Sequence, residues 1–219
     1  MIMYIPKEYW LKRGKIYKEQ FRHDKKKKLQ EKMLIDYLKN VSPFLSVLEV
    51  GCGFGRITKL ILSNFPTIKE YHAVDLSPDQ IENAKEYVKT IPLDKELDLK
   101  FIVSDVQSLQ IDKKYDLVIT SEMLLHILPS EIVEVMTKLV SFSKMHIINI
   151  DFYHETPLKL APHNFLHEYE KIYNKIPLVS KVKRIPIVKN GLFKIDARQS
   201  IFHSLVNVDI DNEKTLKRA

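Results

Sequence analysis

The sequence is short of several residue types and patterns, and each shortage excludes a class of protein. It contains one cysteine, Cys52, which excludes an intramolecular disulfide and a cysteine-rich zinc site. No apolar run approaches the roughly 18–20 residues of a membrane span. The first residues also lack the apolar core and the cleavage site of a signal peptide. We therefore expect a cytoplasmic protein with no membrane partner.

Glycine is scarce as well, and its distribution is uneven. Of the five glycines in 219 residues, three lie within five residues, at positions 51, 53 and 55. Such a cluster predicts a backbone that needs positive φ angles or the close approach of a ligand. The apolar fraction of 45% and the charged fraction of 29% are those of an ordinary globular chain. The length fits one domain, with room for a small appendage.

The net charge of +7 belongs to the two flanks of the chain. Residues 1–40 hold 12 Lys and Arg against 5 Asp and Glu, and residues 171–199 hold 8 against 1. Basic segments attract nucleic acid, anionic substrates and membrane surfaces. A lysine-rich solvated helix face is the commoner explanation, and we favour it.

The centre of the chain alternates strand and helix patterns. Strand patterns cover 46–50, 70–75, 98–103, 115–120 and 144–150, and helical patterns cover 56–65, 79–89 and 130–142, the last with Ser130 as cap. Two helices, 7–21 and 24–40, precede this region, and a helix over 163–175 and strands over 179–188 and 197–208 follow it. The alternation predicts an α/β fold with a doubly wound, mostly parallel sheet, whose last two strands lie antiparallel at one edge. We divide the chain into N-terminal helices (1–40), a core (41–208) and a polar tail (209–219).

The run from Val47 to Arg56, VLEVGCGFGR, reads as a strand that enters a glycine turn and opens a helix. In an α/β sheet, ligands bind beyond the carboxyl ends of the strands. A dinucleotide site has the spacing G-x-G-x-x-G, but its third glycine is replaced here by Arg56. Glu49, two residues before the first glycine, disfavours a pyrophosphate and suits a ligand with an ammonium or sulfonium charge.

Two further carboxylates follow strand patterns. Asp75 ends the second strand, 20 residues after Gly55, where a carboxylate can accept two hydrogen bonds from a ribose diol. Asp105 follows the third strand and can accept an exocyclic amino proton, while Val106 offers a backbone N–H to a ring nitrogen. An adenosine with a positively charged amino-acid tail satisfies all three acidic positions.

These segments resemble the class I S-adenosylmethionine-dependent methyltransferases. The resemblance covers residues 45–153 and rests on VLEVGCGFGRIT, AVDLSPDQIENAK, FIVSDVQSL and YDLVITSEMLLHILP in register. It implies a Rossmann-like seven-stranded sheet with a reversed last strand, N-terminal helices that cover the cofactor as a lid, and S-adenosylmethionine as cofactor with S-adenosylhomocysteine as product. The cofactor-binding positions that it implies are Glu49, Gly51, Cys52, Gly53, Gly55, Asp75, Leu76, Asp105, Val106 and Ser121.

The methyl acceptor has no universal signature, so the sequence narrows it by exclusion. In place of the Asn/Asp-Pro-Pro-Tyr-like segment of enzymes that methylate adenine or glutamine, residues 120–123 read Thr-Ser-Glu-Met. A carbon-5 pyrimidine methylator needs a cysteine nucleophile, and Cys52 lies in the glycine turn instead. The segment from Glu122 to Pro129 is similar to one in the O-methyltransferases of ubiquinone biosynthesis. Leu125 replaces an acidic neighbour of His126 there, so we predict no metal site.

Our candidate catalytic residues are Glu122, His126 and His167. We expect the acceptor pocket at the carboxyl ends of the fourth and fifth strands, bounded also by His154 and His163, because histidine can take a proton near neutral pH. His163 and His167 are four residues apart and would share a helix face. For each histidine, a purely structural role has similar weight.

The favoured function is methyl transfer to an oxygen or nitrogen atom of a small molecule or of a peptide or protein side chain. An RNA methyltransferase that uses the basic flanks, or a non-catalytic cofactor-binding member, are the alternatives, and a NAD-dependent enzyme is a distant fourth. Nucleic acid is thus the less favoured partner, and the chain is predicted to be a monomer or a homodimer.

Overall fold

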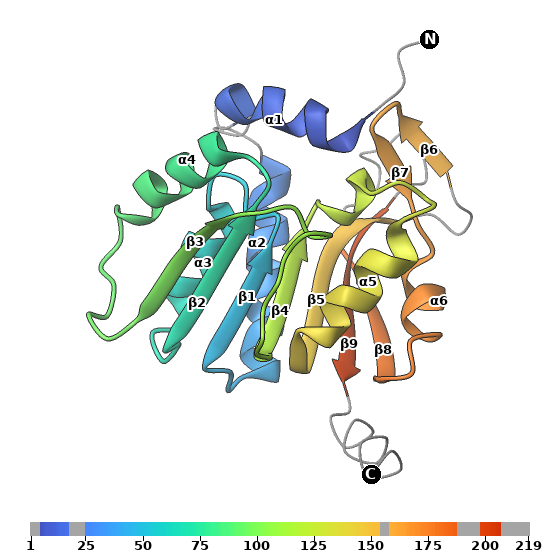
Figure 1. The fold of residues 1–219 in the computed structure, drawn as a ribbon. Coiled ribbons are helices and arrows are strands. Elements are labelled where there is room, and N and C mark those ends of the chain that lie inside the picture. The colour runs from blue at the N-terminus through green and yellow to red at the C-terminus, as the bar shows by residue number, and fades with distance from the viewer. Residues whose placement is uncertain (1–4, 18–24, 154–157, 188–197, 207–219) are drawn as a thin grey trace.

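The computed structural model of the chain describes residues 5–17, 25–153, 158–187 and 198–206. A seven-stranded sheet forms its centre, with the strand order β3-β2-β1-β4-β5-β9-β8 (Figure 1). In that order the strands are β3 (Asp98–Val103), β2 (Glu70–Asp75), β1 (Ser46–Val50), β4 (Tyr115–Ser121), β5 (Ser143–Tyr153), β9 (Arg198–Val206) and β8 (Val179–Pro186). Only β9 is antiparallel to its neighbours in this sheet, which confirms the predicted fold and the reversed last strand.

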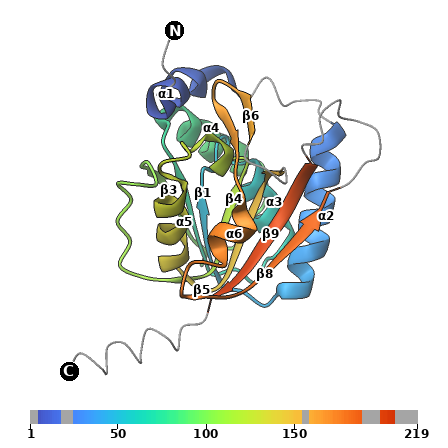
Figure 2. The same cartoon turned by 90° about the vertical axis from the view of Figure 1, so that its right-hand side faces the viewer.

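Helices cover both faces of the sheet. The helices are α1 (Pro6–Tyr17), α2 (Lys25–Val41), α3 (Arg56–Asn64), α4 (Pro78–Val88), α5 (Ile132–Ser141) and α6 (Tyr169–Tyr173). Figure 2 shows α2 and α3 on one side of the sheet and α5 on the other. Each layer buries its own apolar cluster: α2, α3 and α4 contribute to one, and α5 and α6 to the other. This two-sided cover explains why the central strands are buried along their whole length.

The two N-terminal helices have different places in the fold. Leu34 and Leu38 of α2 are completely buried, in the cluster that also contains Ile201 of β9. The helix α2 is therefore part of the core sandwich, although we grouped it with the lid. The helix α1 lies across the carboxyl ends of the strands, close to α4 (Figure 1). A Cβ on Gly14 would lie 2.1 Å from the Oγ of Ser77, so glycine allows this close approach.

Two local predictions are wrong. We expected a helix over 163–175, but a two-stranded sheet of β6 (Leu158–Ala161) and β7 (Asn164–Leu166) occupies its first part, and α6 is short. We expected Ser130 to cap α5, whereas Glu131 holds the cap position without a side-chain hydrogen bond. The helix α4, by contrast, has a side-chain cap, because Ser77 accepts from the backbone N–H of Gln80.

Several predicted features lie outside the described residues. They are the end of the first predicted helix (18–21), the first residue of the second (24), His154 and the tail 209–219. None of the helices in the described part of the chain has the length and apolar character that a membrane crossing requires.

Candidate functional site

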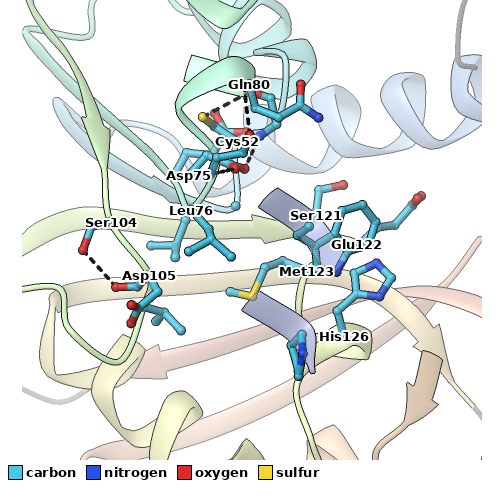
Figure 3. Close-up of a pocket in the computed structure, with 18 of the residues that line it drawn as sticks. Cys52, Asp75, Leu76, Gln80, Ser104, Asp105, Ser121, Glu122, Met123 and His126 are labelled. Atoms are coloured by element: carbon cyan, nitrogen blue, oxygen red, sulfur yellow. Dashed lines mark hydrogen bonds between the residues drawn. The ribbon is translucent and has the colours of Figure 1, made fainter. Parts of the chain in front are cut away.

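A cavity of about 360 Å³ lies at the carboxyl ends of β1, β2, β3 and β4. Its wall is formed by the glycine turn after β1, the first turn of α4, the loop after β3 and the 3-10 helix η2 (Leu124–His126) after β4. Pro6, Lys7 and Trp10 of α1 close it from above. In Figure 3, Asp105 lies on one side of the cavity, and Ser121, Glu122 and His126 lie on the other. The volume is in the usual range for small-molecule sites.

The three clustered glycines all have positive φ, but a side chain would meet different surroundings at each of them. Gly51 (φ 78°) lies against Met123, whose Cγ would be 2.5 Å from an added Cβ. Gly53 (φ 54°) has nothing within 4 Å of that position, so its missing side chain leaves open space in the cavity wall. Gly55 (φ 82°) packs against the backbone of Ala84 in α4 and is not part of the cavity wall. Its predicted cofactor contact is replaced by helix packing.

The N–H groups of this turn are used within the protein. Those of Gly51 and Cys52 donate to the carbonyl of Val74, at 2.8 and 2.9 Å, and that of Gly55 donates to the carbonyl of Cys52 at 3.0 Å. The N–H of Gly53 donates to Asp75 at 2.8 Å. A phosphate-binding turn needs such N–H groups to point at the ligand. The geometry therefore disfavours a dinucleotide, as Arg56 and Glu49 already did in the sequence.

Asp75 connects the glycine turn to α4 while it faces the cavity. Its Oδ2 accepts from Gly53, and its Oδ1 accepts from the N–H of Ser77 at 2.9 Å. A carboxylate has about four acceptor positions, so two are left for a ligand diol. Burial raises the pKa of Asp75, although both hydrogen bonds oppose the rise.

Gln80, in the first turn of α4, is a site residue that sequence reasoning missed. It lines the cavity beside Asp75 (Figure 3), and only 4% of its surface is exposed. Its Oε1 is buried and has no hydrogen-bond partner among the residues that the structure describes. An unpartnered buried acceptor is costly, which suggests that a ligand donor completes it.

Asp105 and Val106, after β3, form the opposite end of the cavity. Asp105 accepts from the N–H and the hydroxyl of Ser108, at 2.7 and 3.1 Å, and from Lys7 of α1 at 3.1 Å. Burial raises the pKa of Asp105, but these donors outweigh it and hold the pKa below its ordinary value. Leu76 and Val106 are apolar neighbours in the same wall. Lys7 of α1, the helix that lies across the strand ends and that we call the roof helix, is thus ion-paired with the carboxylate that we expect to contact adenine.

Glu49 lies at the base of the cavity and is almost completely buried. Its Oε2 accepts from the hydroxyl of Thr58 at 2.5 Å and from that of Tyr71 at 2.7 Å. Burial raises the pKa of Glu49 to about 7, against the effect of these two hydrogen bonds and of Arg56. The carboxyl group is thus poised to change its charge near neutral pH. Cys52 beside it is buried, and burial raises its pKa as well, so it is a filler rather than a nucleophile.

Glu122, directly after β4, joins three other elements. Its Oε1 accepts from Lys27 and from the amide nitrogens of Gln30, at 2.9 Å, and Gln199, at 2.7 Å. Burial raises the pKa of Glu122, but the Lys27 ammonium and the hydrogen bonds together hold it below its ordinary value. Its backbone φ is 54°, a conformation that costs roughly 1 kcal/mol or more outside glycine. Ser121 next to it accepts from Arg56 at 3.3 Å.

The predicted histidine cluster is only partly assembled. His126 lines the cavity, with its ring 4.3 Å from that of Trp10, and its Nδ1 donates to the carbonyl of His163 at 2.8 Å. His163 stacks on Tyr9 at 4.7 Å and does not line the cavity. His167 bonds the carbonyl of Ile127 at 3.1 Å and is likewise outside the cavity wall. The strand β7 separates His163 from His167, so they share no helix face.

The histidine pKa values also differ from our expectation. Burial lowers the pKa of His126 to about 4, and it lowers the pKa of His167 as well. His126 is therefore neutral at pH 7 and a weak base, although we expected a proton acceptor near neutral pH.

A group of metal-ligand side chains exists in the described residues, but at the other end of the sheet. Ligand atoms of Glu70, His72 and Asp98 lie within 4.8 Å of one another, on the first residues of β2 and β3. Lys113 pairs with Glu70, and Lys100 pairs with Asp98 at 2.8 Å. The lysines already neutralise these carboxylates, so the group does not add to the cavity's chemistry.

Residues 47–145, which contain the glycine turn, Asp75, Asp105 and Glu122, match the family model of a methyltransferase domain. Within these residues, which are under half of the 219-residue chain, the protein is similar to the class I S-adenosylmethionine-dependent methyltransferases. The solved structure of magnesium protoporphyrin IX methyltransferase from Synechocystis has the same fold as this chain. The TM-score is 0.72 at 16% identity, over 94% of this chain and 100% of the other. The N-methyltransferase NodS from Bradyrhizobium japonicum gives 0.71 at 14% identity, over 92% and 99%.

Curated relatives match a shorter part of this chain than the solved structures do. A malonyl-[acyl-carrier protein] O-methyltransferase of Ilyobacter polytropus is 41% identical over 35% of this chain and 26% of its own length. A protein of the same name from Acetivibrio thermocellus is 35% identical over 45% of this chain and 34% of its own length. The chain thus spans about a quarter to a third of the length of these relatives.

Proposed function

We propose that the chain binds S-adenosylmethionine in this cavity and transfers its methyl group to an oxygen or nitrogen atom of a small molecule or of a peptide or protein side chain. One observation carries the proposal. The cavity joins open space over Gly53 with unfilled acceptor positions on Asp75 and Gln80, while the N–H groups of all three turn glycines and of Cys52 are bonded within the protein.

The residues divide into three groups. Asp75 and Gln80 would accept the two ribose hydroxyls, and Leu76, Asp105 and Val106 would hold the adenine. Glu49, Gly51, Cys52, Gly53 and Ser121 would surround the amino-acid part. The bound cofactor supplies a methyl group on a positively charged sulfur, which makes a protein nucleophile unnecessary.

The acceptor side needs little acid–base chemistry from the protein. His126 is a weak base because its pKa is about 4, and Glu122 is ionised and held by three donors. What remains for these residues is to bind and orient the acceptor and to exclude water. His167 lies outside the cavity wall and would act only through the carbonyl of Ile127.

Calorimetry with S-adenosylhomocysteine and with NAD tests the proposed cofactor. We expect binding of the first and no binding of the second. Transfer of labelled methyl groups from S-adenosylmethionine to a small-molecule extract, a peptide mixture and bulk RNA then tests the acceptor class. Binding without transfer to any of them would support the non-catalytic alternative.

RNA stays the less favoured acceptor. Lys7 and Lys27, from the basic N-terminal segment, are in ion pairs with Asp105 and Glu122 inside the site. Some of the flank's charge therefore serves the cavity rather than an outer surface.

The roof helix gives a prediction about the rate of cofactor release. Deletion of residues 1–22 removes Trp10 and Lys7 from the cavity, and Trp10→Ala removes the ring contact with His126. We expect both changes to speed release of S-adenosylhomocysteine, roughly tenfold for Trp10→Ala, because a large apolar contact is lost. Displacement by excess ligand in a stopped-flow instrument measures the rate. Leu11→Ala, on the outer side of the same helix, is the matched control. If the deletion instead weakened RNA binding and left the release rate of S-adenosylhomocysteine unchanged, the result would support the RNA methyltransferase alternative.

Glu49 gives a prediction about pH. Its carboxyl group is protonated below about pH 7 and charged above it, and a cationic ligand favours the charged form. We expect S-adenosylmethionine to bind more tightly as the pH rises from 6 to 8, with release of up to one proton from Glu49 near pH 6.5. Calorimetry in buffers of different ionisation enthalpy measures the proton count. Glu49→Gln should remove this part of the pH dependence, and an unchanged proton count in that variant would contradict the assignment.

Without ligand, the same shift acts on folding with a defined sign. The raised pKa means that the folded chain holds this proton more tightly than the unfolded chain does. The stabilisation from neutral Glu49 is therefore complete below about pH 4.5 and is lost as the pH rises through about 7.

A further inference from the structure

The donors around Glu122 converge on one of its two carboxylate oxygens. Lys27, Gln30 and Gln199 all donate to Oε1. In the described part of the chain, no donor reaches Oε2. The side chain lines the cavity and keeps 14% of its surface exposed. The printed donors of this ionised carboxylate thus all engage one oxygen of a side chain that lines the cavity, and they leave the acceptor positions of the other oxygen unused.

The backbone at Glu122 has a left-handed conformation, which residues other than glycine rarely adopt. Its φ of 54° is uncommon for a residue with a side chain, and the N–H donates to the carbonyl of Ile150 at 2.7 Å. Strained residues of this kind persist where the surroundings fix them, and they are frequent at functional sites. Here the strain directs a long acidic side chain from the end of β4 toward the elements α2 and β9.

The charges around the cavity disfavour a negatively charged acceptor. Three cations line the described cavity, and each already has a carboxylate partner: Lys7, Lys27 and Arg56. A carboxylate acceptor would meet no uncommitted cation among these three, and it would be repelled by ionised Glu122.

We propose that Oε2 of Glu122 accepts a hydrogen bond from the nucleophilic group of the acceptor, so that the acceptor is an amine or a hydroxyl compound and not a carboxylate. This inference rests on the proposed methyl transfer and names the chemical class of its acceptor. Lys27, Gln30 and Gln199 are positioning residues in it, because they act through Oε1. Trp10 and His126, whose rings lie 4.3 Å apart, line the same cavity as Glu122.

The stability of the product toward base tests the class. The full chain is incubated with methyl-labelled S-adenosylmethionine and the small-molecule fraction of an extract of its source cells. A methyl ester, formed from a carboxylate, releases labelled methanol in mild base, whereas N-methyl and O-methyl ether products keep the label. We expect base-stable products, and their masses and fragmentation separate the amine arm from the hydroxyl arm. A base-labile label would overturn the inference while leaving the proposed methyl transfer intact. No label at all, in this fraction or on peptides, would contradict the proposed function itself.

Variants test the residue. We expect Glu122→Gln to raise the KM for the labelled acceptor about 10- to 100-fold, because a charged hydrogen-bond acceptor is lost, and to change the Kd for S-adenosylhomocysteine less than about twofold. Glu134→Gln on the exposed part of α5 removes the same charge and is the matched control. Gln199→Leu leaves Glu122 in place, frees one position on Oε1 and should raise the KM less. A merely structural role would lower the melting temperature and alter cofactor binding without a selective effect on KM, and that result would overturn the inference.

Discussion

Replacement of Gly53 by valine is expected to weaken cofactor binding roughly 100-fold while the chain still folds. The position has a φ of 54° and nothing within 4 Å of an added Cβ, so a side chain there would extend into the cavity rather than into the core. The left-handed backbone costs roughly 1–2 kcal/mol of stability for a residue other than glycine. Overfilling a close-packed contact with the ligand weakens binding roughly 100-fold. Calorimetry with S-adenosylhomocysteine measures the loss.

Gly55→Val is the matched comparison for this prediction. Its added Cβ would meet the backbone of Ala84 at 3.1 Å, outside the cavity wall. We therefore expect a large drop in melting temperature, with affinity retained in the fraction that folds. If Gly53→Val bound S-adenosylhomocysteine as the unchanged chain does, the ligand would not pass over this glycine, and the proposed placement would be wrong.

Asp75→Ala is expected to weaken cofactor binding by roughly 1.5–3 kcal/mol, about 10- to 150-fold in Kd. The substitution removes the acceptor for the proposed ribose hydroxyls. It also releases the N–H groups of Gly53 and Ser77, which Asp75 holds at 2.8 and 2.9 Å. Calorimetry measures the affinity, and thermal unfolding separates the effect on the turn from the effect on binding.

Two controls make the Asp75 result interpretable. Asp112→Ala, on an exposed turn, removes the same charge and should leave the affinity unchanged. Asp75→Asn keeps an acceptor oxygen and should lose less affinity than alanine does. Unchanged affinity in Asp75→Ala would show that this carboxylate only fastens the glycine turn to α4.

The central sheet could be predicted closely from the sequence because β1 and most of β2 are buried, and the edge strand β3 is bounded by polar residues. The runs at 46–50, 70–75 and 98–103 have the bounds of β1, β2 and β3. A parallel strand covered by helices reads as a short continuous apolar run, and the glycines and Pro78 between the runs mark the turns.

The prediction of a helix over 163–175 was wrong because the local sequence pattern is compatible with both a helix and a short hairpin. His163 and His167 have helical spacing, but Asn164–Leu166 pairs with Leu158–Ala161 instead. A three-residue strand carries too little alternation to be recognised, and its partner lies beyond a turn at Pro162. The four-residue spacing of the two histidines does not reflect a helix, because His163 precedes β7 and His167 follows it.

The cavity's cofactor side was accessible to sequence reasoning, and its acceptor side was not. Glu49, Asp75 and Asp105 follow predicted strands, so topology alone places them at one edge. Lys27 and Gln199 reach Glu122 across 95 and 77 residues of sequence, from elements whose packing no local pattern encodes. The apolar stripe of α2 predicted a buried face but not the sheet face that it covers.

Gln80 is a different kind of omission. It lies in the first turn of α4, where a polar residue usually faces solvent, but only 4% of its surface is exposed. Its unpartnered Oε1 is visible only once every neighbour is placed.

A crystal structure of the full chain with S-adenosylhomocysteine tests the central claim most directly. The account predicts the ribose hydroxyls within hydrogen-bond distance of Asp75 and Gln80, the adenine beside Asp105 and Val106, and the sulfur on the side of Glu122 and His126. Density for the ligand outside this cavity, or in it with the adenine next to Glu122, would contradict the account.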